Sequence, residues 1–318
     1  PAPAPAPAPS RPAAGRRSAL CIGIDAYPAA QHRLSGCVND ARAWSDALAR
    51  LGFEVRSLLD GQATRAALDA QLRELIAASR AGDVLVVQYS GHGTRVPDLD
   101  GDETDGRDEA LCPVDFASGA LFIDDDIAEV LALVPEGVNL TLFMDCCHSG
   151  TNTRFAVGLA PGATALPPDS KPRFVEPTPQ LLAAHAQFRQ GRRSAAPPGG
   201  TGGPQHMRHV KFSACLDEEV ALESGGQGEF TRRATRVLAR GIDGLNHQRF
   251  LEAVLAEFGP AARQQPMLDC APAARFAPLL QPLARGAQAA TVDGGAGLQQ
   301  AVAALAQSVQ ALQGLLPR

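Results

Sequence analysis

The chain of 318 residues has no long apolar run, no block of basic residues and few aromatic side chains. Without an apolar stretch of about 18 residues, the sequence predicts no membrane-spanning helix. The formal net charge is -5 and only 5% of the residues are aromatic. A basic, aromatic-rich surface of the kind that binds nucleic acid is therefore not expected. We predict that neither a membrane nor a nucleic acid is a partner of this protein.

Paired metal-binding cysteines are also missing. None of the seven cysteines belongs to a CxxC pair, which argues against a zinc site. Several of them lie in or beside apolar segments, where a free thiol packs as a small apolar group. This usage favours a reducing compartment and a cytoplasmic protein. Because the chain begins at Pro1 rather than at Met, export after removal of an upstream signal stays an alternative.

Composition divides the chain into five segments. Residues 1–17 form a disordered Pro/Ala-rich spacer, and residues 158–206 form an exposed connection rich in Pro, Gly and Arg. Over 18–157, apolar strand-like runs alternate with amphipathic helix-like segments, and the pattern resumes over 207–280. Such alternation predicts an α/β fold, with a mostly parallel sheet of about six strands and helices on both faces. Residues 281–318 carry a short heptad pattern, so either a helix docked on a monomer or self-association is expected.

The most informative residues follow two predicted strands. The apolar run at 84–89 leads into YSGHG, which contains His92, and the run at 138–144 leads into DCCHSG, which contains two cysteines. The carboxyl ends of parallel strands meet at one edge of a sheet, where α/β proteins place their chemistry. A thiol becomes a strong nucleophile once a neighbouring imidazole takes its proton. The two motifs therefore predict a Cys-His peptidase dyad.

Six motifs in order resemble those of the metacaspases, which belong to the caspase-haemoglobinase-like peptidases. GCVND, YSGHG, DEALCPVDF, FIDDDI, DCCHSG and FSAC follow one another within residues 18–278. The resemblance implies a caspase-like three-layer sandwich made of a large and a small part. It also implies Cys147 as the nucleophile, His92 as the base, and the backbone N–H groups of Gly93 and Cys147 as oxyanion donors. Strand alternation turns Cys146 toward the opposite face, into the core.

The resemblance implies hydrolysis after Arg or Lys. The residues that match the specificity pocket include two carboxylates, which suit the planar guanidinium of a bound arginine and would repel an acidic side chain. A helix N-cap is the alternative role for Asp40. The expected function is an endopeptidase acting on peptides or proteins, and the alternatives are a peptidase of other specificity or a catalytically silent signalling or assembly module. The matching pocket residues are Cys37, Asp40, Ser90 and Asp145.

A calcium site is a further implication of the resemblance, with Asp108, Asp124 and Asp125 as ligands. Clustered carboxylates suit this hard cation. The chain departs from the family pattern at the fourth expected ligand, where Arg154 stands. We expect its guanidinium to replace the cation wholly or in part. No cofactor should therefore be required, and calcium dependence should be weak or absent.

Self-cleavage in the connection is a last expectation. Exposed, flexible chain segments are preferred sites of proteolysis, and a peptidase specific for basic residues would cut beside them. An insertion that is never cut is the alternative. The basic residues considered are Lys171, Arg173, Arg189, Arg192 and Arg193.

Overall fold

The computed structural model describes residues 15–99, 101, 103, 105–147, 170–190, 207–216, 219–259 and 262–283. Chain contacts group residues 1–282 into one compact unit, to which the described elements belong. The predicted N-terminal spacer up to residue 14 and the heptad-bearing segment from residue 284 lie outside the described residues. Among the described helices, none is long and apolar enough to cross a membrane.

A six-stranded sheet forms the centre of the fold, in the order β12-β9-β7-β3-β1-β2. Its strands pair in parallel except for the edge strand β12, which is antiparallel to β9. Every residue of β3 and β7 is buried, as expected for central strands that are covered on both faces. The strands are β1 (Arg17–Gly23), β2 (Glu54–Leu59), β3 (Val84–Ser90), β7 (Asn139–Asp145), β9 (His209–Ser213) and β12 (Met267–Asp269).

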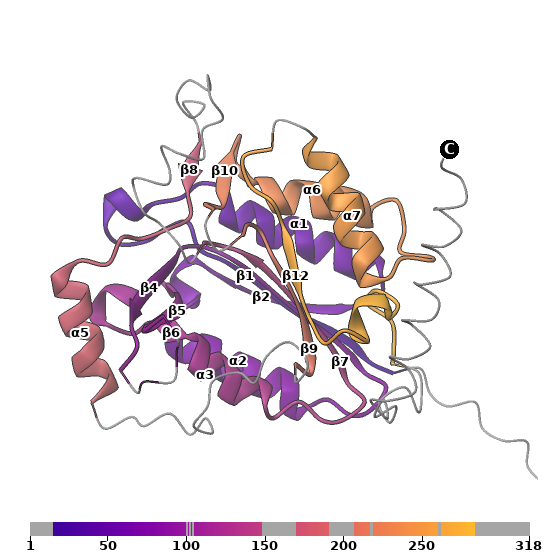
Figure 1. Ribbon diagram of the computed structural model, residues 1–318, viewed down its shortest axis with the longest axis horizontal. Coiled ribbons are helices and arrows are strands. Elements are labelled where there is room, and N and C mark those ends of the chain that lie inside the picture. Colours follow the sequence, from indigo (N-terminus) through magenta and orange to yellow (C-terminus); the bar gives the residue numbers. More distant parts are fainter. Residues whose placement is uncertain are drawn as a thin grey trace, which may run out of the picture. The chain divides into compact units, whose positions relative to one another are not determined.

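Helices cover both faces of this sheet, so the predicted three-layer α/β fold is confirmed (Figure 1). On one face, Trp44 of α1 packs with Phe143 and with Phe230 of α6 in one apolar core. On the other face, Leu68 and Leu72 of α2 belong to a second core. The first face carries α1 (Cys37–Arg50), α6 (Glu229–Leu238) and α7 (His247–Phe258), and the second carries α2 (Arg65–Ala77) and α3 (Asp124–Leu131).

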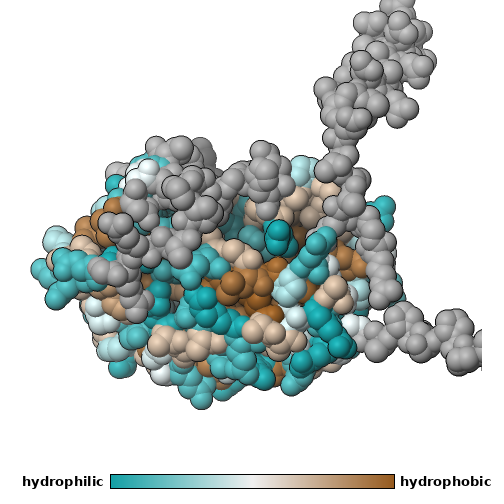
Figure 2. All heavy atoms as spheres, turned by 90° about the horizontal axis from the view of Figure 1, so that it is seen from below, coloured by the Kyte–Doolittle hydropathy of each residue, from teal (hydrophilic) through white to brown (hydrophobic). Residues whose placement is uncertain are grey.

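Figure 2 views the molecule from the side of α2 and α3. Hydrophilic residues predominate on this face and surround a smaller apolar patch. At the start of α2, the Thr64 hydroxyl accepts a hydrogen bond from Ala67 N at 3.2 Å, as the sequence predicts for an N-cap.

Helix α1 begins earlier than the sequence predicts. Its apolar spacing suggests a start near Ala41, but the helix begins at Cys37 with Gly36 as the N-cap. The Asp25 carboxylate accepts hydrogen bonds from Cys37 N at 2.8 Å and from Val38 N at 3.1 Å, which satisfies the free N–H groups of the first turn. Asp40 therefore lies inside the first turn, and the alternative that it caps the helix is wrong.

Two small sheets flank the main one. Strands β4, β5 and β6 form an antiparallel sheet that starts directly after His92, and β8, β10 and β11 form another. The connection predicted over 158–206 is exposed at β8 and contains a helix, α5, where the sequence predicts a short one near Gln180 to Arg189, but the expected exposure is wrong at Arg173 and Val175, which are buried. The elements are β4 (Gly93–Pro97), β5 (Arg107–Leu111), β6 (Phe122–Ile123), β8 (Lys171–Pro172), β10 (Leu222–Ser224), β11 (Gln227–Gly228) and α5 (Pro179–Arg189).

Candidate active site

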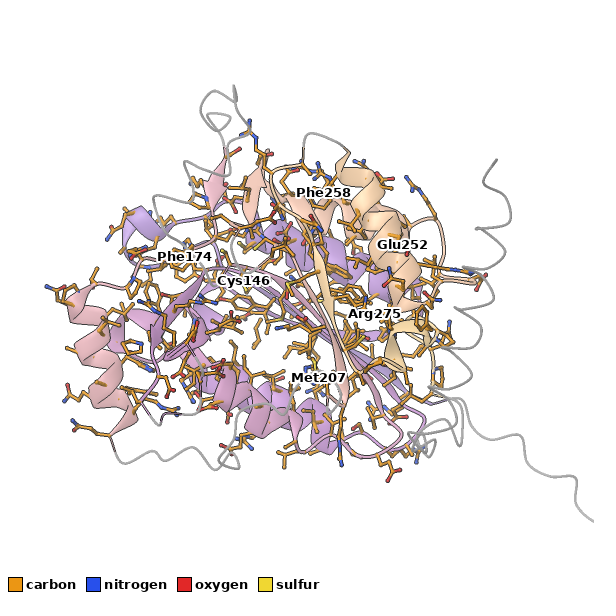
Figure 3. The ribbon with its side chains drawn as sticks, viewed as in Figure 1. Cys146, Phe174, Met207, Glu252, Phe258 and Arg275 are labelled. Atoms are coloured by element: carbon orange, nitrogen blue, oxygen red, sulfur yellow. The ribbon has the colours of Figure 1, made fainter. Side chains whose placement is uncertain are left out.

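The two predicted motifs leave the main sheet at the same edge. Strands β3 and β7 are paired in register up to their last residues, Ser90 and Asp145. The loop that carries His92 follows the first strand, and Cys146 and Cys147 follow the second. In Figure 3, the labelled Cys146 lies at this end of the strands, beside β4 and β5. The parallel pairing thus places both motifs at one edge of the sheet, as predicted.

Hydrogen bonds define the tautomer of the His92 ring. Its Nε2 lies 2.8 Å from the His32 carbonyl oxygen, which can only accept, so Nε2 carries the proton of the neutral ring. Nδ1 is buried and makes no hydrogen bond within the described part of the chain. Burial lowers the pKa of His92 to about 4, so the ring is neutral near pH 7. The ring therefore offers Nδ1 as a base.

Two tyrosines fix the loop that carries this histidine. Tyr27 Oη accepts from His92 N at 3.0 Å, and Tyr89 Oη donates to His92 O at 2.8 Å. Both hydroxyl groups press against Gly91, where an added Cβ would lie 2.6 Å from Tyr89 Oη and 2.9 Å from Tyr27 Oη. Only glycine leaves room for this arrangement, which explains the glycine that precedes the histidine in YSGHG.

The adjacent cysteines face opposite sides of the sheet. Cys146 belongs to the core beneath α2 and α3, as strand alternation predicts, and Cys147 belongs to the core beneath α1 and α6. The Cys147 thiol donates to the Glu219 carbonyl oxygen at 2.9 Å. In this conformation the thiol proton is therefore directed to the main chain at Glu219.

The carbonyl oxygen of Arg173 accepts two hydrogen bonds at the strand tips. One comes from Gly93 N at 3.1 Å and the other from Cys147 N at 3.3 Å. These N–H groups are the two predicted oxyanion donors. The surrounding chain is held as well, because Arg173 N donates to Ala221 O at 3.0 Å and Val175 N donates to Gly93 O at 3.0 Å. The Arg173 carbonyl thus lies beside the cysteine, between the two donors, and Phe174, labelled in Figure 3, follows it at the same end of the sheet.

The Arg173 side chain fills an acidic pocket and is fully buried. Its Nη2 donates to Asp40 at 2.6 Å and to Glu223 at 3.4 Å, and its Nη1 lies 2.9 Å from Asp145 Oδ1. Burial opposes the positive charge, but the neighbouring Asp145, Cys37, Asp40 and Glu223 keep the pKa of Arg173 well above its usual value. A guanidinium among three carboxylates is the arrangement that a site for basic side chains requires.

The four predicted pocket residues are not equally involved. Asp40 and Asp145 bind the guanidinium directly, and Cys37 Sγ lies 3.9 Å from Glu223 Oε2 at the edge of the same cluster. Ser90 is fully buried, and its hydroxyl accepts from Gln88 Nε2 at 2.7 Å. Sequence reasoning missed the third carboxylate, Glu223, because no motif surrounds it. Glu223 reaches the pocket because it lies in β10, which pairs with β8, the strand that directly precedes Arg173.

Helix α6 orients the second carboxylate. Asp145 Oδ2 accepts from Thr231 N at 3.0 Å and from Thr231 Oγ1 at 2.6 Å, within the first turn of the helix. Carboxylates are favoured at this positive end of a helix. Gly228, which precedes the helix, is required here, since an added Cβ would lie 2.3 Å from Asp145 Oδ2 and 2.8 Å from Asp40 Oδ2. The segment that contains Gly228 and the start of α6 thus helps to shape the pocket.

The predicted calcium ligands belong to a second group of carboxylates, around β5 and α3. Asp108 lies in β5, and the helix begins with Asp124 and Asp125. Burial raises the pKa of Asp124 to about 7, and Glu109, Glu103 and Asp125 add to this effect. The structure does not gather these three carboxylates into a metal site: among the described residues, the one cluster of three ligand atoms within 4.8 Å of one another is that of Asp25, Cys37 and Glu223. The fourth position, Arg154, lies outside the described residues.

The six-stranded sheet with helices on both faces is a caspase-like fold. The structure is similar to that of a protein from Geobacter sulfurreducens, with a TM-score of 0.66, 26% identity, and coverage of 84% of this chain and 100% of that one. In fold alone it is also similar to caspase-1 from Spodoptera frugiperda, with a TM-score of 0.53, 12% identity, and coverage of 81% of this chain and 87% of that one.

The sequence comparison relates the first half of the chain to one family of peptidases. Residues 17–155 match the model of the metacaspase peptidase C14 domain. Metacaspase-1 of Cryptococcus neoformans is 38% identical over 148 residues, which cover 43% of this chain and 32% of that protein. The match therefore spans about a third of that curated relative. Over residues 17–155, which make up less than half of the chain, the sequence is similar to the metacaspase family.

Proposed function

We propose that this chain is a cysteine endopeptidase that cleaves after Arg or Lys and that it hydrolyses its own Arg173–Phe174 bond. The observation that carries the proposal is the binding of Arg173. Its carbonyl oxygen accepts from Gly93 N and Cys147 N, and its guanidinium occupies the acidic pocket. Arg173 thus takes the position expected of the substrate residue that precedes the cleaved bond.

The reaction begins with transfer of the Cys147 thiol proton to Nδ1 of His92. This requires the Cys147 thiol to turn from the Glu219 carbonyl oxygen toward the His92 ring, because its one proton cannot be donated to both acceptors. The sulfur then attacks the Arg173 carbonyl carbon, and the oxygen gains negative charge between its two N–H donors. One such donor contributes about 3 kcal/mol to transition-state stability.

Collapse of this intermediate breaks the peptide bond. His92 gives its proton to the departing nitrogen of Phe174, and an acyl-enzyme forms between Cys147 and Arg173. Water then attacks the thioester with His92 as the base, which releases the Arg173 carboxylate and restores the thiol. The His92 pKa of about 4 keeps the ring neutral before the reaction, so Nδ1 has a lone pair for the thiol proton, and the imidazolium that forms is a strong acid toward the leaving nitrogen.

The pocket supports cleavage after basic residues. Asp40 and Asp145 lie on different nitrogens of the Arg173 guanidinium, so a planar fork satisfies both. An aspartate or glutamate in the same place would leave several carboxylates buried together without a cation, which is costly. We infer that peptides ending in Arg or Lys are hydrolysed and that those ending in Asp are not.

The test compares the purified chain with two single variants, Cys147→Ala and Cys146→Ala. The second is the matched control, because Cys146 is equally buried but faces the other core. Intact-mass measurement should show two fragments, ending at Arg173 and beginning at Phe174, in the native chain and in the control only. Fluorogenic peptides ending in Arg, Lys or Asp are assayed in parallel.

The outcomes separate the parts of the proposal. An unbroken chain that still hydrolyses Arg peptides would mean that Arg173 is a permanent occupant of the pocket rather than a cleavage site. A chain with no turnover of any peptide, and with the same mass as Cys147→Ala, would contradict the peptidase assignment and favour a silent module.

A further inference from the structure

Two thiols meet at one carbonyl oxygen behind the catalytic centre. The Cys147 thiol donates to Glu219 O at 2.9 Å, and the Cys215 thiol donates to the same oxygen at 3.6 Å. Both cysteines are buried in the same core. They are far apart in the sequence but come together because β7 and β9 are parallel neighbours. Their paired residues Met144 and Ser213 lie just before the two cysteines.

The two thiols also interact with each other. The pKa of Cys215 is raised well above its usual value, first by a hydrogen bond with the Cys147 thiol and then by burial. When two thiols share a proton, one stays protonated and donates to the other. The raised pKa keeps the Cys215 thiol protonated, and its sulfur lies near that of Cys147 beside the Glu219 carbonyl oxygen. A thiolate with a protonated thiol beside it is the arrangement of an attacking and a resolving cysteine.

We propose that Cys147 and Cys215 form a reversible disulfide that switches the nucleophile off under peroxide. This proposal rests on the function proposed above, in which Cys147 is the nucleophile. The Cys147 thiolate attacks one oxygen of hydrogen peroxide, giving a sulfenic acid and hydroxide. The Cys215 sulfur then displaces the hydroxyl group, and the S–S bond forms with loss of water. In total, two thiols and one peroxide yield one disulfide and two waters.

The other cysteines are poorer partners. Cys146 directly precedes the nucleophile but faces the opposite core, and a disulfide between adjacent residues is strained. Cys270 shares the core of Cys147 and Cys215 but directly follows the edge strand β12, away from the tip of β7. Cys270 therefore serves as the control position. Among the described cysteines, Cys147 and Cys215 are the two whose thiols donate to one carbonyl oxygen, so Cys215 is the thiol best placed to resolve a sulfenic acid at Cys147.

The experiment treats the reduced full chain with hydrogen peroxide, blocks the remaining thiols, and maps cross-linked peptides by mass spectrometry without reductant. We expect a Cys147–Cys215 peptide, with hydrolysis of an Arg peptide at least about tenfold slower and restored by dithiothreitol. In Cys215→Ala and Cys215→Ser, peroxide should still inactivate, but dithiothreitol should no longer restore activity, because the sulfenic acid is oxidised further. Cys270→Ala should behave as the native chain.

Two outcomes would contradict the proposed disulfide switch. Absence of the Cys147–Cys215 peptide from the oxidised native chain contradicts it, as does full recovery of both Cys215 variants. The cross-link is detected by mass, so it is independent of turnover. A chain that forms the cross-link but cleaves no peptide would refute the proposed function alone, and an active chain without the cross-link would refute the switch alone.

Discussion

Two groups of carboxylates in this protein differ in where their positive charge comes from. Around the pocket, the chain itself supplies the cation, because Arg173 lies among Asp40, Asp145 and Glu223. Around α3, no ion pair to Asp124 is formed within the described residues, and its pKa rises to about 7. Burial raises the pKa of Asp40 in the pocket to about 7, as it does that of Asp124, but only at Asp40 does a guanidinium of the chain oppose the rise.

The largest expected effect comes from removing one pocket charge. Asp145→Asn should lower kcat/KM for Arg peptides by about 100-fold to 1,000-fold, since a buried charge then lacks its partner. The matched control is Asp269→Asn, whose half-exposed pair with Lys211 lies at the sheet edge and should change turnover by less than about twofold. Steady-state kinetics on both variants measures the difference, and equal effects would contradict the pocket assignment.

The next effect concerns stability. In a Cys147→Ala background, which prevents cleavage, Arg173→Met should lower the free energy of unfolding by about 3 kcal/mol, because three carboxylates lose their shared cation. Arg56→Met removes an exposed ion pair with Glu74 and should have a much smaller effect. Urea denaturation measures both. If the two variants lose the same free energy of unfolding, the ion pairs of Arg173 do not hold the chain around Arg173 in the pocket.

A smaller effect is expected from the third carboxylate. Nη2 of Arg173 contacts both Asp40 and Glu223, whereas a lysine offers only one ammonium group to the pocket. Glu223→Gln should therefore reduce the preference for Arg over Lys about tenfold, which corresponds to about 1.4 kcal/mol. The ratio of kcat/KM for two matched peptides is the measurement. An unchanged ratio would show that Asp40 and Asp145 alone set the preference.

A pH-dependent effect on stability is expected from the second carboxylate group. The native carboxyl of Asp124 binds a proton more tightly than the unfolded one, because its pKa is about 7 rather than 3.8. The free energy of unfolding should therefore fall as pH rises from about 4 to about 7. Asp124→Asn should flatten this fall in urea titrations at several pH values. A variant with the same pH dependence as the native chain would exclude Asp124 as its source.

The second carboxylate group also leads to predictions for the binding and the effect of calcium. Ionised carboxylates bind the cation, so its affinity should increase as the pH rises through about 7 and level off above it, where the effect of Asp124→Asn should be largest. Because Arg154 stands at the fourth position, we expect calcium to change peptide hydrolysis by no more than about threefold. Activity measured with chelator and with added calcium checks this, and a large activation would contradict the role given to Arg154.

Local patterns were enough to predict the sheet and the motif residues. The central strands are continuous apolar runs, and His92 and Cys147 follow them directly, so neighbouring residues carry the information. The position of Arg173 was not predictable in this way. It lies in a Pro-rich stretch that composition marks as exposed, and its partner Asp40 is 133 residues away. Nothing short of the tertiary fold shows that this particular arginine is buried.

Glu223 illustrates the same limit. It accepts from Ser35 N at 2.9 Å and Gly36 N at 3.1 Å, across more than half of the chain, as well as from Arg173. An isolated glutamate in a short strand gives no sequence signal for such a role. The early start of α1 was missed for a related reason, since the Asp25 carboxylate that supports it comes from a different part of the chain.

The pairing of β7 with β9 has a consequence for the hydrolysed protein. β7 precedes the Arg173–Phe174 bond and β9 follows it, yet the two are adjacent central strands with residues 140–144 matched to 209–213. Breaking that bond would cut the backbone without parting the two pieces, which share a continuous hydrogen-bonded ladder and one apolar core. The nicked molecule should migrate at its original size in gel filtration and come apart only in denaturant.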